Sequence, residues 1–331
     1  MLVNGGTVLM VLVFPLSRRT TLTWLSGIGG GRIPYDVNTA LIPAALRCIA
    51  SLARAGMYKS HADWGTLADT YAKVWEDETL RFFEVNVPES EAKQRLSAYS
   101  KSAFPGPDQA DSIDSDVQFY ALSLDGYDNL SQVQVMNTDD CFRHFLLNTT
   151  NQTQLTSFVN QTANNIRRTF PAGLMTSVGV VVANPAYGPD PVYAANWTNG
   201  AYHGTVIWSW QLAMMARGLE LQIDRCNSGS PPDFCADSSV ANNAKAAYNK
   251  LWDNIEENEA NLSTEVWSWT YKDGFQFTPL GVIPAPGGVG QTGESIHTSL
   301  LKLLINYPPE SDIRQLWSLT FLAVKRNKAF K

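Results

Sequence analysis

Glu265 is the side chain whose sequence surroundings most favour chemistry. It stands in NLSTEVWSWTYKDGF, close to Trp267, Trp269, Tyr271 and Phe275. Flanking rings can desolvate and orient a carboxylate. Apolar sugar faces pack on flat rings, and a pair of carboxyl groups can hydrolyse a glycosidic bond. The segment is therefore typical of a sugar site, although a helix-terminal or surface acid fits the composition equally well.

Two other segments contain acidic residues for which a structural role is favoured. Asp36 lies in GRIPYDVNTAL, where an N-cap that accepts backbone N–H bonds is favoured over catalysis by the local pattern alone. Asp139 and Asp140 lie in MNTDDCF, a pattern that predicts a polar turn.

Patterns for other chemistries are missing from the sequence. It contains neither G-x-S-x-G nor H-E-x-x-H, and its four histidines are far apart along the chain. We therefore expect no metal site and no cofactor. His203 differs from the other histidines because it stands in AYHGTVIWSW, between an aromatic-rich loop and an apolar helical stretch.

A glycine-rich segment near the C-terminus could suggest nucleotide binding. Gly288, Gly290 and Gly293 fit G-x-G-x-x-G, but prolines stand where the preceding strand should end. Read as a P-loop, the segment places Glu294 where a phosphate-binding lysine is required. Nucleotide binding is not expected.

Composition excludes further classes of protein. The 331 residues are 44% hydrophobic and 17% charged, with a net charge of -6, which argues against disorder and against a nucleic-acid partner. The most apolar stretch, Val8 to Leu16, is too short to span a membrane. It fits either the apolar region of a signal peptide or a buried segment, so secretion and a cytoplasmic location both remain open.

The pattern of cysteines and glycosylation sequons favours a secreted protein. Cys226 and Cys235 flank a Ser/Gly/Pro loop and predict a local disulfide, whereas Cys48 and Cys141 are expected to be buried small hydrophobic residues. Six Asn-x-Ser/Thr sequons, typical of a secreted glycoprotein, begin at Asn129, Asn148, Asn151, Asn160, Asn196 and Asn261.

Helical periodicity dominates the chain. Apolar spacing and capping residues predict helices at 36–55, 61–83, 89–102, 153–168, 205–224, 238–259 and 312–328. The helix at 205–224 is apolar on every face and is therefore expected in an inner layer. Short strands are expected at 117–124 and 132–136, so the fold class is predicted to be all-α with short β insertions.

Several segments resemble fungal and bacterial proteins of the glycogen-debranching and six-hairpin glycosidase superfamily. They are GGGRIPYDVNTALIPAALR, VMNTDDCFRHFLL, GLMTSVGVVVANPAY, AYHGTVIWSWQLAMMARGLELQ, STEVWSWTYKDGFQFTPLG and RQLWSLTFLAV. The most specific is Y-H-G-T-V-x-W-S-W, which is similar to a Tyr-x-Gly-x-x-Trp-Pro-Trp segment of such enzymes. The resemblance runs from about Gly27 to the end of the chain.

The resemblance implies an (α/α)6 toroid that binds sugar at the mouth of its inner ring. It divides the chain into an atypical segment, 1–26, and a partial catalytic domain, 27–331. Because too few helices are predicted for a full toroid, the fold is expected to be incomplete at its N-terminus.

The function that the resemblance implies is inverting hydrolysis of an α-linked glucan or related glycoside, by a monomer. Glu265 corresponds to the general base and Asp36 is the nearest candidate for the general acid. The residues expected to shape the sugar pocket are Arg32, Tyr202, His203, Trp208, Trp210, Trp267 and Trp269. The alternative is a truncated or degenerate carbohydrate-binding protein without turnover.

Overall fold

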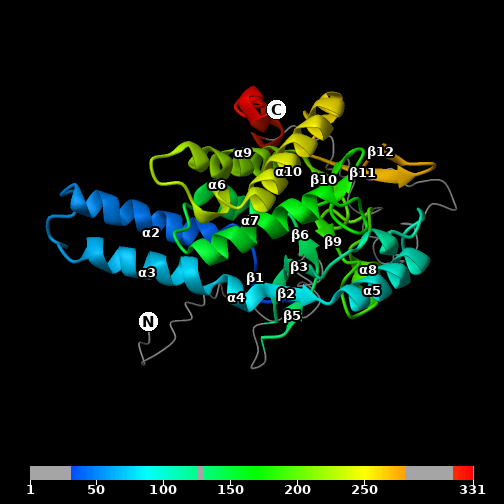
Figure 1. The fold of residues 1–331 in the computed structure, drawn as a ribbon, viewed down its shortest axis with the longest axis horizontal. Coiled ribbons are helices and arrows are strands. Elements are labelled where there is room, and N and C mark those ends of the chain that lie inside the picture. The colour runs from blue at the N-terminus through cyan, green and yellow to red at the C-terminus, as the bar shows by residue number, and fades with distance from the viewer. Residues whose placement is uncertain (1–30, 126–129, 281–315, 331) are drawn as a thin grey trace, which may run out of the picture.

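The structure is a computed structural model in which residues 31–125, 130–280 and 316–330 are described. Helices form its body (Figure 1). The longer ones are α2 (Asn38–Arg54), α3 (Trp64–Glu78), α5 (Glu89–Ser102), α7 (Gln152–Arg167), α9 (Ser209–Asp224) and α10 (Ser238–Glu257). The shorter ones are α4 (Leu80–Phe83), α6 (Asp140–Leu146) and α8 (Val192–Asn196).

Small antiparallel sheets lie at the end of the molecule away from α2 and α3 (Figure 1). One sheet has the order β1 (Ile33–Pro34), β4 (Ser123–Leu124), β5 (Gln132–Val133), and another has the order β10 (Ile207–Trp208), β11 (Val266–Tyr271), β12 (Phe275–Pro279). The two-stranded sheets pair β2 (Glu84–Val87) with β3 (Val117–Tyr120), β6 (Met136–Asn137) with β9 (Ala183–Asn184), and β7 (Met175–Thr176) with β8 (Gly179–Val180).

These sheets overturn the predicted fold class. The described residues form a mixed α and β structure with five small sheets, and not an all-α (α/α)6 toroid. The β11–β12 hairpin turns through Asp273 and Gly274, which both adopt positive φ. An Asp-Gly pair between alternating apolar residues is a hairpin signal that helical periodicity does not register.

Most of the predicted helices are present, with differences at their ends. The helix predicted at 89–102 has those bounds, and those predicted at 153–168 and 238–259 are correct to within two residues. The start predicted at Thr205 is wrong because the chain enters α9 through strand β10. The last predicted helix lies partly outside the described residues, and its remainder forms the 3₁₀ helices η6 (Leu316–Leu322) and η7 (Lys328–Phe330).

Helix α2 buries a different face from the one that its larger apolar residues predict. Leu41 and Leu52 are 46% and 39% exposed, and Cys48 is exposed rather than buried. The buried side is made of smaller residues, among them Ala40 and Ala50.

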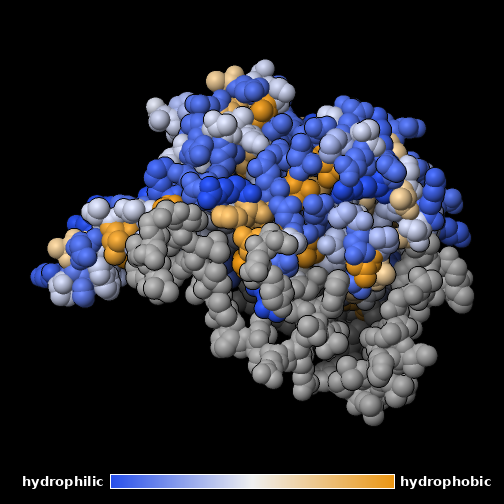
Figure 2. All heavy atoms as spheres, turned by 90° about the horizontal axis from the view of Figure 1, so that it is seen from below, coloured by the Kyte–Doolittle hydropathy of each residue, from blue (hydrophilic) through white to orange (hydrophobic). Residues whose placement is uncertain are grey.

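Seen from below, the described residues that are not covered form a mainly hydrophilic surface with scattered apolar patches (Figure 2). No described helix is long and apolar enough to cross a membrane.

Helix α6 packs against α2 and α9, and hydrogen bonds from Arg143 to Thr39 and from Gln211 to Asp139 join it to the first turns of both helices. Arg143, buried in α6, donates to the backbone carbonyls of Thr39 in α2 (3.2 Å) and Glu76 in α3 (3.0 Å). The Glu76 carbonyl is in the last turn of α3, where helical donors run out, and the Thr39 carbonyl lacks its helical donor because residue 43 is proline. One side chain thus fixes α2 and α3 against α6.

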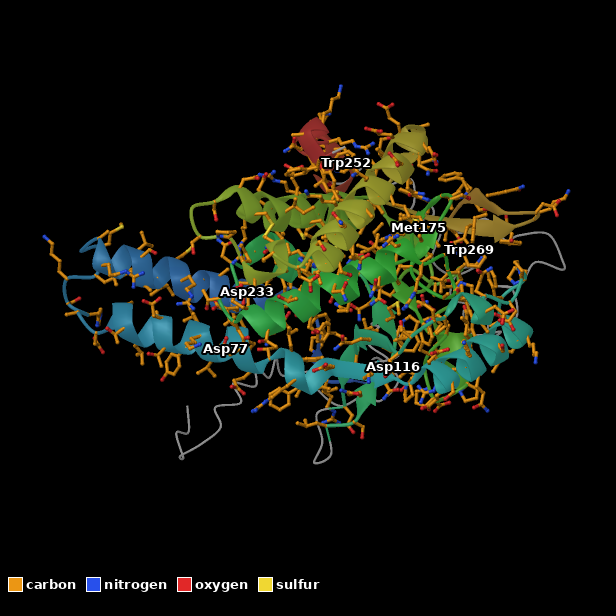
Figure 3. All side chains as sticks on the ribbon, viewed as in Figure 1. Asp77, Asp116, Met175, Asp233, Trp252 and Trp269 are labelled. Carbon is orange, nitrogen blue, oxygen red and sulfur yellow. A yellow bond between two sulfur atoms is a disulfide. The ribbon has the colours of Figure 1, made fainter. Side chains whose placement is uncertain are left out.

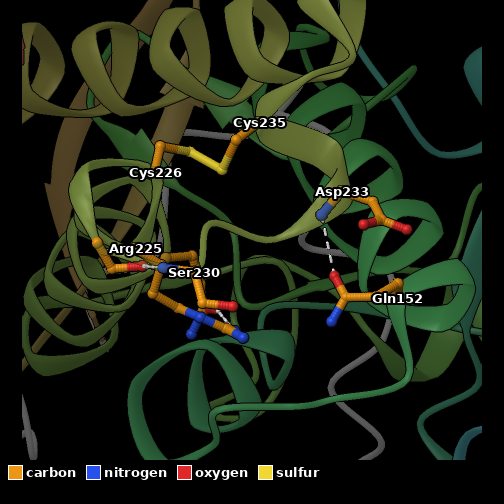
Figure 4. The surroundings of a disulfide bond; sticks show 8 residues. Gln152, Arg225, Cys226, Ser230, Asp233 and Cys235 are labelled. Carbon is orange, nitrogen blue, oxygen red and sulfur yellow. Dashed lines mark hydrogen bonds between the residues drawn. A yellow bond between two sulfur atoms is a disulfide. The ribbon is translucent and has the colours of Figure 1, made fainter.

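The predicted disulfide is confirmed. Cys226 and Cys235 are joined, with their Cα atoms 5.4 Å apart, and the bond closes the loop between α9 and α10. Figure 4 shows this loop held to the start of α7, where the backbone N–H of Asp233 donates to Oε1 of Gln152 at 3.0 Å. Cys141 is buried as expected.

Candidate functional site

Asp36 and Asp139 form a carboxyl pair at the starts of two helices. Asp36 lies two residues before α2, and its Oδ1 accepts a bond from the backbone N–H of Asn38 at 2.9 Å, although the N-cap position predicted for it is taken by Val37. Asp139 directly precedes α6, and its Oδ1 accepts a bond from Nε2 of Gln211 at 2.8 Å. Both carboxyl groups are half-buried.

The pair favours a proton on Asp139. Burial raises the pKa of Asp139 to about 8, the charges of Asp36 and Asp140 act in the same direction, and the bond from Gln211 opposes them. Burial also raises the pKa of Asp36, while the hydrogen bonds from Asn38 lower it. A carboxyl group that keeps its proton near neutral pH and is still partly accessible can act as a general acid.

Asp140 differs from its neighbour because it is part of a buried polar network. The network consists of Tyr35, Asp140, Arg143, Gln161 and Thr162. Oδ1 of Asp140 accepts from the Tyr35 hydroxyl, and Oδ2 accepts from Gln161 and Thr162, at distances of 2.7–2.9 Å. The polar turn predicted at these two acids is correct for Asp139, which lies in the turn before α6, and wrong for Asp140, which begins α6 and lies in the core.

Glu265 is placed at the end of the loop before β11. Its backbone carbonyl accepts a bond from the N–H of Ser209 at 3.0 Å, and its Oε1 accepts from the Tyr202 hydroxyl at 2.9 Å. The side chain is buried, with 4% of its surface exposed. The Tyr202 hydroxyl is thus a positioning group that fixes one carboxylate oxygen of Glu265.

The first turn of α9 connects Glu265 to the carboxyl pair. Ser209 binds the backbone of Glu265, and two residues later Gln211 binds the side chain of Asp139. The amide of Gln211 is itself oriented, because its Oε1 accepts from the Thr138 hydroxyl at 2.5 Å. Residues far apart in the sequence are therefore gathered around one helix start.

A row of aromatic rings runs along the same helix start. Tyr202 lies 5.2 Å from Trp208, Trp208 lies 5.7 Å from Trp210, and Trp210 lies 5.7 Å from Phe142, measured between ring centroids. Trp208 and Trp210 are half-buried and His203, which contacts Trp208 at 5.0 Å, is exposed. The row joins the Glu265 side of the site to α6, which follows Asp139.

Trp267 and Trp269 do not take the part expected of them. They are 0% and 3% exposed, and their indole N–H groups donate to the backbone carbonyls of Val178 (2.7 Å) and Thr205 (2.6 Å). Trp269 lies on the sheet side of the molecule, near the β11–β12 hairpin (Figure 3). A ring enclosed by protein cannot offer its face to a sugar, so these two residues belong to the core.

Arg32 is exposed at the edge of the β1–β4–β5 sheet. Its backbone N–H donates to the carbonyl of Leu124 at 2.7 Å, and in the sequence it stands four residues before Asp36.

Two open grooves, of about 400 and 500 Å³, lie over α7 and α10, and no predicted site residue lines either of them. Within the described part of the chain, no group of three or more metal-ligating side chains was found.

Local sequence could not identify two members of the site. The raised pKa of Asp139 depends partly on the charge of Asp36, which is remote in sequence. Gln211 is surrounded in the sequence by apolar residues typical of core packing. The available signal was the acidic pair directly before the amphipathic stretch CFRHFLL, which is typical of a helix start.

No family model matches the sequence, and the searches of curated proteins and of solved structures likewise found no match.

Proposed function

We propose that the chain is a glycoside hydrolase in which Asp139 is the general acid and Glu265 is the general base. The observation that carries the proposal is that the Asp139 carboxyl group and the backbone of Glu265 both bond to the first turn of α9, beside a row of partly exposed rings. The resemblance of the sequence segments adds the substrate class, an α-linked glucan or related glycoside. Asp36, the acid predicted from sequence, instead helps to keep Asp139 protonated.

The proposed reaction uses the two carboxyl groups in opposite protonation states. Asp139 donates its proton to the glycosidic oxygen as the bond from that oxygen to the anomeric carbon breaks. Glu265 accepts a proton from a water molecule whose oxygen forms the new bond to the anomeric carbon. Water attack from the opposite face inverts the anomeric configuration, and inverting enzymes separate the two carboxyl groups by about 6.5–9.5 Å.

The aromatic row supplies the sugar contacts in this proposal. Trp208 and Trp210 keep part of their surface exposed, and Trp208 is oriented by the bond from its indole N–H to the carbonyl of Tyr202 at 3.0 Å. Oriented rings bind apolar sugar faces at little cost in side-chain entropy. His203 and Arg32 are exposed donors that can reach sugar hydroxyl groups at the edge of such a site.

The test is a screen of α-linked glycosides with the anomer of the product followed by NMR. Turnover with inversion is expected, and Glu265→Gln should reduce it by about 10²–10⁴-fold while sugar binding is kept. Turnover unchanged in Glu265→Gln contradicts the proposal. Sugar binding by the unaltered chain with no turnover of any glycoside would favour the carbohydrate-binding alternative. Asp114→Asn, at a carboxylate that is 86% exposed, is the matched control.

A further inference from the structure

The loop between α6 and α7 exposes one glycosylation sequon in an extended segment. Its residues alternate, with Leu147 and Thr149 buried and Asn148 and Thr150 exposed. Asn148 and Thr150 are the asparagine and the hydroxyl residue of the sequon Asn148-Thr149-Thr150. Both groups that define the sequon therefore face solvent from the same strip of backbone.

Contacts from α9 and the following turn hold the inner side of this loop. Nε2 of Gln222 donates to the carbonyl of Leu147 at 3.1 Å, and Nη2 of Arg225 donates to the carbonyl of Thr149 at 3.0 Å. These bonds use the buried backbone and leave the Asn148 side chain outside. A large group attached to Asn148 would thus extend into solvent without displacing any of these contacts.

The disulfide lies directly beside the loop. Arg225, which holds Thr149, precedes Cys226, and the loop closed by Cys226 and Cys235 contacts the start of α7 through Gln152 (Figure 4). Stable disulfides form in oxidising compartments, including the lumen in which asparagine is glycosylated. Formation of the disulfide and glycosylation of an exposed sequon can therefore take place in the same compartment.

We propose that Asn148 carries an N-linked oligosaccharide. The donor is an oligosaccharide on a lipid diphosphate. A bond forms between Nδ2 of Asn148 and the anomeric carbon of the sugar, the bond from that carbon to the diphosphate oxygen breaks, the amide loses one proton, and the lipid diphosphate leaves.

Two nearby sequons are less suited to carry a glycan. Oδ1 of Asn151 accepts a bond from the N–H of Gln154 at 3.1 Å, which fixes this side chain as the cap of α7. Asn160 lies within α7, where its Oδ1 accepts from Asn243 at 2.8 Å, and the hydroxyl residue of its sequon, Thr162, is buried. The modification is therefore assigned to Asn148 and not to its neighbours.

The test is site-specific mass spectrometry of the full chain produced in the secretory pathway of a eukaryotic cell behind a cleavable signal peptide. Enzymatic release of glycans in heavy-oxygen water should mark Asn148 as converted to aspartate. Thr150→Ala should remove this mark, whereas Thr153→Ala, which destroys only the Asn151 sequon, should leave it. Both threonines are exposed, so the two variants are matched in their effect on folding.

Disulfide mapping of the same sample shows whether the chain folded in an oxidising compartment. A secreted chain with Cys226 bonded to Cys235 and with unmodified Asn148 would overturn the proposal, as would a glycan on Asn151 that persists in Thr150→Ala.

Discussion

Asp139 and Asp140 are adjacent in the sequence, yet the regions around them differ in exposure and in partners. Asp140 is buried and has three hydrogen-bond donors of 2.9 Å or less. Asp139 is half-buried, accepts a side-chain bond of 2.8 Å from Gln211, and faces the charge of Asp36. The helix start turns one carboxyl group into the core and the other toward the surface, so only Asp139 combines access with a reason to hold a proton.

Different environments can give neighbouring carboxyl groups different roles. Burial raises the pKa of both groups, but Tyr35, Gln161 and Thr162 oppose that rise for Asp140 by bonding to its charged form. A buried carboxyl group with several donors contributes to stability, and one beside a like charge is poised for proton transfer. Four experiments test this contrast between Asp139 and Asp140.

The largest expected effect is on turnover in Asp139→Asn. If Asp139 is the general acid, kcat/KM should fall by about 10²–10⁴-fold, because the amide cannot donate the proton to the leaving oxygen. At about pH 4 the free energy of unfolding should change by less than about 1 kcal/mol, since Asn resembles the protonated acid in shape, and at higher pH Asp139→Asn should be the more stable chain because it takes up no proton on folding. Steady-state kinetics and urea unfolding measure the two quantities. Undiminished kcat/KM would end the assignment of Asp139 as acid.

The next effect is on stability in Asp140→Ala. Removing this carboxyl group leaves the Tyr35 hydroxyl and Gln161 amide without their acceptor, in a region that also contains buried Arg143. Breaking a buried network of this kind costs about 3–5 kcal/mol. Urea unfolding should show a loss of that size, and Asp140→Asn should lose less because it keeps one acceptor. A loss below about 1 kcal/mol for Asp140→Ala would show that the network contributes little.

The third effect is a dependence of stability on pH that Asp139 should cause. Its pKa is about 8 in the folded chain and about 3.9 in the unfolded chain, so between these values the folded state binds more protons. The free energy of unfolding should therefore fall as pH rises from about 4 to about 8, by at most about 1.4 kcal/mol per pH unit for one proton. Urea unfolding across this range should give a flatter profile for Asp139→Asn. Identical profiles would contradict the raised pKa.

Local signals explain why much of the helical body could be predicted. Helix α5 begins directly after Pro88 and carries acidic residues in its first turn, and α10 follows Asp237, whose side chain accepts bonds from two backbone N–H groups. Such capping patterns are contained within a few residues. Strand β10 gave no comparable signal, because an apolar run next to an apolar helix has no distinguishing period.

The site was harder to predict because its members meet through tertiary contacts. The sequence prediction of Glu265 depends on its aromatic neighbours, but two of those neighbours, Trp267 and Trp269, are buried in the core. Alternation along a strand that is buried on both faces hides which rings are accessible. The raised pKa of Asp139 arises from Asp36 and from burial, and neither is visible in MNTDDCF.

The smallest expected effect comes from Gln211→Leu, which removes the one side-chain bond to Asp139 that lowers its pKa. The pKa of Asp139 should rise, so the alkaline limb of the kcat/KM profile, where the acid loses its proton, should move to higher pH. Loss of the positioning bond should also lower kcat/KM by at most about tenfold, since a hydrogen bond between uncharged groups contributes about 0.5–1.5 kcal/mol.

The control for Gln211→Leu is Thr138→Val, which keeps the amide but removes the hydroxyl that orients it. It should move the alkaline limb in the same direction by a smaller amount. A purely structural Gln211 would lower kcat/KM and leave the limb in place. That outcome would show that Gln211 does not set the pKa of Asp139 during turnover. The contrast between Asp139 and Asp140 would still hold, because it depends on Asp36 and burial as well as on this bond.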